Sequence, residues 1–134
     1  MALVAGLLLF PVPAMALDCA IINALDNYRT SLVAPKEANC ATYRTASLAN
    51  AVSCHWSHGY RSESAVHQAD ALWQELTHCR PGQSLPADPA VNHPDSYDLR
   101  RWASHDAVYA LSVKDKAGQS RTLVFLRLEP PGAP

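Results

Sequence analysis

Three residues that lie close together carry the side-chain types of a hydrolase triad: His93, Asp95 and Ser96. In such a triad the histidine takes a proton from the serine, and the carboxylate orients the imidazole. Neighbours within a few residues rarely reach that geometry, and the chain has no Gly-x-Ser-x-Gly turn to present the serine. The stretch therefore favours a turn that starts a strand, with hydrolysis kept as a minor hypothesis.

Four of the six histidines crowd into residues 55–78, and histidine is the commonest metal ligand. On a regular strand His55 and His58 point to opposite faces, so only a bulge would bring them together. His67 and His78 share a helix face but lie roughly 16 Å apart. We therefore predict no metal and no other cofactor. A metal-binding protein that uses the His55/His58 region is the alternative function.

The first sixteen residues have the features of a signal peptide. The apolar run from Ala2 to Phe10 is too short to span a bilayer, and Ala14-Met15-Ala16 is a small-residue cleavage site, although no Lys or Arg precedes the run. We expect residues 1–16 to be removed. Residues 17–129 should then form one domain, followed by a flexible tail over 130–134. The expected location is the periplasm or the cell exterior.

The formal net charge of −1 gives no sign of the basic patch that nucleic acid or anionic lipid requires. We expect no nucleic-acid partner and no membrane span in the mature chain. Trp and Arg are favoured at the hot spots of protein interfaces. The predicted partner-binding residues are therefore Trp102, Arg100 and Arg101, with His93 beside them.

All four cysteines lie after the cleavage site, and an even count in an exported chain predicts two disulfides. Three pairings are open. Cys54 is predicted on the inner side of a strand, and Cys79 at the edge of the apolar face of the next helix. Proximity favours Cys54–Cys79, which leaves Cys19–Cys40.

The elements follow from periodicity and from turn residues. Asp18 can cap a helix that starts at Cys19 and is closed by Pro35. Strands are predicted over about 41–47 and 51–60, and a second helix from Ser62 to about residue 79. A proline-rich irregular link follows. The last three strands are predicted over residues 97–104, 107–114 and 121–129.

This order, α-β-β-α-β-β-β, predicts an α+β fold: an antiparallel sheet of about five strands with two helices packed on one face. The core side of the second helix should carry Val66, Ala69, Leu72, Trp73 and Leu76, and its outer side His67, Asp70, Gln74 and His78. The inner side of the second strand should carry Cys54, Trp56, His58 and Tyr60.

No motif of known catalytic function stands out in the chain. We expect a small exported binding or interaction protein without enzymatic activity. It would be an inhibitor, an immunity-type protein or an envelope accessory factor, and its partner would be another protein or an envelope component.

Overall fold

The structure is a computed structural model that describes residues 6, 8, 18–86 and 96–131. The predicted signal peptide apart from residues 6 and 8, the His93–Asp95 stretch and residues 132–134 lie outside the described residues. The elements are α1 (Ala20–Ser31), β1 (Asn39–Arg44), β2 (Asn50–Gly59), α2 (Glu63–Cys79), β3 (Gly82–Leu85), β4 (Ser96–Ser104), β5 (Val108–Lys116), the 3-10 turn Ala117–Gln119 and β6 (Arg121–Glu129).

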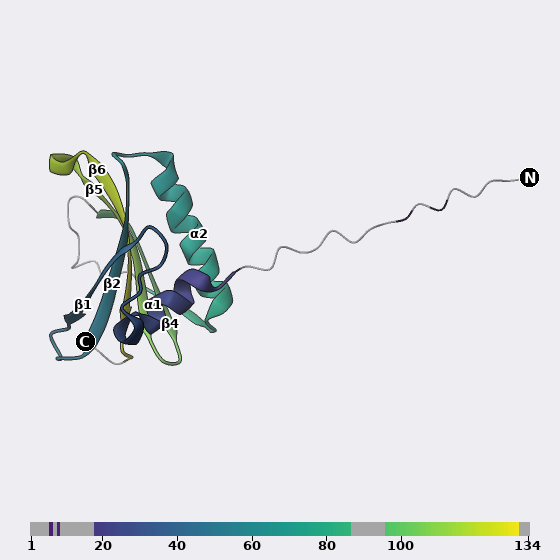
Figure 1. Cartoon of the computed structure of the whole chain (residues 1–134), viewed down its shortest axis with the longest axis vertical. Helices are drawn as coiled ribbons and strands as arrows, with labels where there is room; N and C mark the ends of the chain where they lie inside the picture. Colours follow the sequence, from purple (N-terminus) through teal and green to yellow (C-terminus); the bar gives the residue numbers. More distant parts are fainter. Residues whose placement is uncertain (1–5, 7, 9–17, 87–95, 132–134) are drawn as a thin grey trace, which may run out of the picture.

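The strands form one antiparallel sheet in the order β1-β2-β6-β5-β4-β3. Both helices lie on the same side of it (Figure 1). The α+β class and the antiparallel sheet are confirmed, but the sheet has six strands and not five. The additional strand is β3, within the stretch predicted to be irregular.

The strand β3 escaped prediction because it is a short edge strand without an apolar alternation. Its first three residues are exposed, so no buried face marks it in the sequence. Gly82 is required there: a Cβ at this position would lie 2.1 Å from the carbonyl oxygen of Ala103 on β4. Only glycine allows the two backbones to approach so closely.

The core lies between the helices and the sheet face that they cover. Alternate residues of β2, β5 and β6 point into it, as the period of two requires. Its fully buried members include Ile22 and Leu25 of α1, Leu72 and Leu76 of α2, and Val52, Cys54, Leu111, Val113, Val124 and Leu126 of the sheet.

Two residues predicted to face the core do not. Val66 is 40% exposed, because the buried stripe of α2 begins one residue earlier, at Ala65, and continues through Ala69. These two small side chains are completely buried. Tyr60 is also 40% exposed, because β2 ends at Gly59 and the alternation ends with it.

The start of α1 is held by two carboxylates. Asp18 Oδ1 accepts the Ala20 backbone N–H at 3.0 Å, as its capping role predicts, although the helix begins at Ala20 and ends at Ser31, ahead of Pro35. The buried carboxylate of Glu75, on α2, accepts the Ile22 N–H at 2.8 Å. Burial raises the pKa of Glu75, and its bond to Ile22 opposes that rise.

All four cysteines form disulfides, but the predicted pairing is wrong. The bridges are Cys19–Cys79 and Cys40–Cys54. Cys40 and Cys54 are direct partners in the β1–β2 register, so their side chains point to the same face at a Cα–Cα distance of 4.1 Å. Cys79, at the end of α2, joins the residue before α1. Two disulfides are consistent with export to an oxidising compartment.

Candidate functional site

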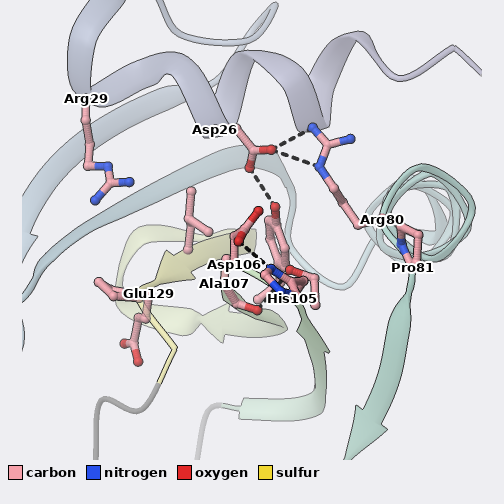
Figure 2. A pocket seen from close by; sticks show the side chains of 12 residues that line it. Asp26, Arg29, Arg80, Pro81, His105, Asp106, Ala107 and Glu129 are labelled. Carbon is pink, nitrogen blue, oxygen red and sulfur yellow. Dashed lines mark hydrogen bonds and ion pairs between the residues drawn. The ribbon is translucent and has the colours of Figure 1, made fainter.

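A pocket of about 330 Å³ opens where segments of several helices and strands converge. One wall is α1, and a second is the chain that leaves α2 at Arg80 and Pro81. The third is the turn between β4 and β5, and the last is the end of β6 (Figure 2). Because these segments are distant in sequence, the pocket exists only when the helices are docked on the sheet.

The ionic wall of the pocket is built around Asp26. Its Oδ2 atom accepts hydrogen bonds from Arg80, at 2.6 Å from Nη2 and 2.9 Å from Nε. Its Oδ1 atom accepts the Tyr109 hydroxyl at 2.6 Å. Figure 2 shows Asp26 and Arg80 meeting from α1 and from the end of α2, and Tyr109 comes from β5. Arg80 also donates to the Asn23 side chain at 2.8 Å.

The electrostatics of this network keep Tyr109 and Arg80 protonated. Burial, together with the bond to Asp26 and its charge, raises the pKa of Tyr109 well above the usual range of a phenol. Burial alone would lower the pKa of Arg80, but its bonds to Asp26 raise it on balance. With both oxygens of Asp26 occupied, the three groups form a fixed wall and are poorly placed to transfer protons.

The floor of the pocket is apolar and its rim is polar. Ala107 and Leu128 are buried in the floor beside the Tyr109 ring. At the rim, Arg29 is exposed and donates only to the backbone carbonyl of Asn50, at 3.3 Å. Such a pocket suits a ligand with a small apolar body and a charged end.

Three further titratable groups at the rim are already bonded within the protein. His105 Nδ1 lies 2.7 Å from Asp106 Oδ1 in the exposed turn between β4 and β5. Glu129 Oε1 accepts the Tyr43 hydroxyl at 2.8 Å. Of the charged groups that line the pocket, Arg29 is therefore the one whose hydrogen bond among the described residues is with a backbone carbonyl and not with a side chain.

The predicted partner-binding residues separate onto two sides of the sheet. Trp102 packs edge-on against Trp73 at 5.8 Å and donates its indole N–H to the Arg80 carbonyl at 3.0 Å. Arg100 bonds Asp98 and Asp70, each at 2.7 Å.

These two residues thus tie β4 to α2. Arg101 points to the opposite side and donates to the Pro86 carbonyl at 3.5 Å. His93 lies outside the described residues.

The histidine cluster is dispersed by the fold. His55 stacks near Phe125 on one face of β2, with ring centroids 5.3 Å apart. His58 lies on the other face, as predicted for the inner side of this strand, and bonds Ser64 at 2.9 Å and also Gln68. His67 and His78 are exposed on α2, as predicted. Among the described residues no three His, Cys, Asp or Glu side chains gather as metal ligands would.

Sequence reasoning missed the residues of the pocket. Asp26, Arg80 and Tyr109 come from three distant segments, and no local pattern marks them. A buried tyrosine at an inward position of a strand is the one available signal, because its hydroxyl needs a partner.

Within the described ranges, no helix is long and apolar enough to cross a membrane. Comparisons of the chain with protein-family models, with curated proteins and with solved structures gave no match.

Proposed function

We propose that the protein is an exported binding module, periplasmic or secreted, that holds part of a partner in the pocket beneath α1. The observation that carries this proposal is that the pocket is preformed. The Cys19–Cys79 bridge ties the start of α1 to the end of α2, and the Asp26–Arg80 ion pair ties α1, about two turns further along, to the residue that follows Cys79. A preorganised site loses little free energy to ordering when its ligand binds.

Binding is favoured over catalysis by the state of the polar groups. Asp26 and Tyr109 have the chemistry of a base and an acid, but each is the other's hydrogen-bond partner. A ligand would meet an apolar floor and the guanidinium of Arg29. That combination favours a carboxylate attached to a small apolar group, such as a side chain or chain end that protrudes from a partner.

The size of the pocket fits this class of ligand. At about 330 Å³ it lies near the lower end of ligand sites, which hold roughly 300–1,000 Å³. One protruding group of a protein or of an envelope component would fill it. An inhibitor, an immunity-type protein or an envelope accessory factor would use such a site to recognise its partner.

The proposal is tested by cross-linked co-purification from envelope extract with two charge-reversal variants. Arg29 and Arg44 are both exposed arginines, but only Arg29 lines the pocket. Arg29→Glu should weaken recovery of the captured component about tenfold, since a hydrogen bond to a charged group contributes about 1.5–3 kcal/mol. Arg44→Glu should recover it like the wild type. Equal recovery by both variants, with unchanged melting temperatures, would contradict the proposal.

A further inference from the structure

The face of the sheet opposite the helices, called here the open face, carries a concentration of positive charge. Strand pairing places its residues: Arg101 pairs with Ala110, Lys114 with Leu123 and Lys116 with Arg121, and Arg127 pairs with both Ser53 and Ala110. Partners in an antiparallel ladder share one face. The basic residues of the open face are therefore Arg101, Lys114, Lys116, Arg121 and Arg127.

Negative charge on the open face is scarce. Glu129 is its one carboxylate among the described residues, and that group already accepts the Tyr43 hydroxyl. The whole chain has eleven Lys and Arg against twelve Asp and Glu. Five of those eleven cations thus lie on a surface with a single acid among the described residues, so within the described part of the chain the near-zero net charge conceals an uneven distribution of charge between the two faces.

Aromatic rings lie among these cations. Lys114 Nζ lies 5.1 Å from the centre of the Phe125 ring, and His55 contacts the same ring. The centre of the face is closely packed, with Ser112 4% and Leu123 9% exposed. Cations held over aromatic rings on a firm surface are typical of protein interfaces.

We propose that the open face is a docking surface for an acidic segment of a partner protein. Charge complementarity identifies the occupant as anionic. The dimensions fit a protein: β2, β4, β5 and β6 have nine or ten residues and are about 30 Å long, and together with the shorter β1 and β3, at a spacing of about 4.8 Å, they offer roughly 750 Å². This area is close to the ~800 Å² that each partner buries in a standard interface.

A lipid surface fits this face less well. The Phe125 ring is half-buried and lies beneath Lys114, so it does not protrude as an apolar anchor for insertion into a bilayer. Nucleic acid also fits less well. Its binding depends on many phosphate contacts, whereas the open face is a sheet surface on which apolar side chains lie among the cations. Both remain as outcomes of the test.

The open face and the pocket are separate features that meet only at the end of β6, near Glu129. The docking surface needs no ligand in the pocket. Its failure and the failure of the pocket proposal are therefore distinguishable, because different residues are changed in the two tests.

The experiment measures binding of fluorescein-labelled poly-L-glutamate by anisotropy, with a double charge reversal on β6. Wild type should bind at about 50 mM salt and bind clearly more weakly at about 300 mM, because exposed charges are screened beyond the Debye length. Arg121→Glu combined with Arg127→Glu should weaken binding at least about tenfold.

The matched control combines Lys36→Glu with Arg44→Glu. Both residues are exposed and neither belongs to the open face. This variant has the same net charge as the β6 variant and should bind at least about three times more tightly than it does. Equal weakening in the two variants would overturn the proposal, because it would reflect net charge alone.

Two parallel measurements distinguish the source of the negative charge. Vesicles of phosphatidylcholine with phosphatidylglycerol, and a short DNA duplex, are titrated under the same conditions. Tighter binding of wild type to either one than to poly-L-glutamate would overturn the protein-partner proposal, and so would absence of binding to poly-L-glutamate at low salt.

Discussion

The charged side chains on the two faces of the sheet differ in how many carboxylates lie near them. On the helix side, three arginines are paired with carboxylates inside the molecule: Arg61 with Asp115, Arg80 with Asp26, and Arg100 with Asp70 and Asp98. On the open face, five cations share one described carboxylate. The same alternation that sends apolar side chains to the core thus also sorts the charged side chains, so that basic residues outnumber acidic ones on the described part of the open face.

This comparison predicts where stability resides. Ion pairs and hydrogen bonds on the helix face connect elements distant in sequence, such as β4 to α2 through Arg100. Breaking them leaves a partly buried partner unsatisfied, which costs more than loss of an exposed contact. Changes on the helix face should therefore destabilise the protein, whereas changes on the open face should alter binding and leave the fold intact.

The largest effect is expected from the bridge that joins the two helices. Removing it with Cys19→Ser and Cys79→Ser should lower the free energy of unfolding by about 4 kcal/mol, because the bridge closes the longer loop, with a sequence separation of 60. Removing Cys40–Cys54, with a separation of 14, should cost about 3 kcal/mol. Urea unfolding measures both. A larger loss from the shorter loop would show that chain entropy does not set the order.

A neighbouring pair on β6 isolates the two faces at one point in the sheet. Leu126 is completely buried on the helix face, and Phe125 is half-buried on the open face. Leu126→Ala should cost about 3 kcal/mol, as expected for a leucine removed from a packed core. Phe125→Ala should cost about 1 kcal/mol, since less of its surface is removed from water. Thermal and urea unfolding of the two variants measure these losses. A larger loss from Phe125→Ala than from Leu126→Ala would indicate that the open face is covered in solution.

The smallest effect concerns a tyrosine of the open face at high pH. Burial, and then the hydrogen bond and charge of Glu129, raise the pKa of Tyr43 to about 12. The folded value lies above the unfolded value of about 10, so the protonated phenol stabilises the fold fully below about pH 10. That contribution is lost as the pH rises through 12.

The measurement compares wild type with Tyr43→Phe by urea unfolding from about pH 9 to about pH 12. The stability of the wild type should fall more steeply than that of the variant. Parallel curves would show that folding does not raise the pKa of Tyr43.

The local features of the fold could be predicted from the sequence, and its long-range pairings could not. Periodicity located α1, α2 and five of the strands, because each of these elements buries one side. The strand β3 was missed because none of its residues is fully buried. The disulfide pairing was wrong because spacing does not contain the register that places Cys40 opposite Cys54.

The binding surfaces show the same limit. Arg101 was predicted to bind a partner, and it lies on the open face, but the four other cations of that face come from β5 and β6. Their grouping depends on the central position of β6 between β2 and β5. The pocket depends on the docking of α1 against the end of α2. Neither arrangement produces a recognisable pattern within a single stretch of sequence.

The covalent loop closed by Cys19 and Cys79 has a consequence for survival among proteases. Every peptide bond between these residues lies inside a closed ring of chain, and the Cys40–Cys54 bridge closes a smaller ring within it. A single cut in this region leaves the two sides of the cut joined through sulfur and releases no fragment. Both helices and the strand pair β1–β2 would therefore stay attached to one another after such a cut, and this part of the chain would remain in one piece.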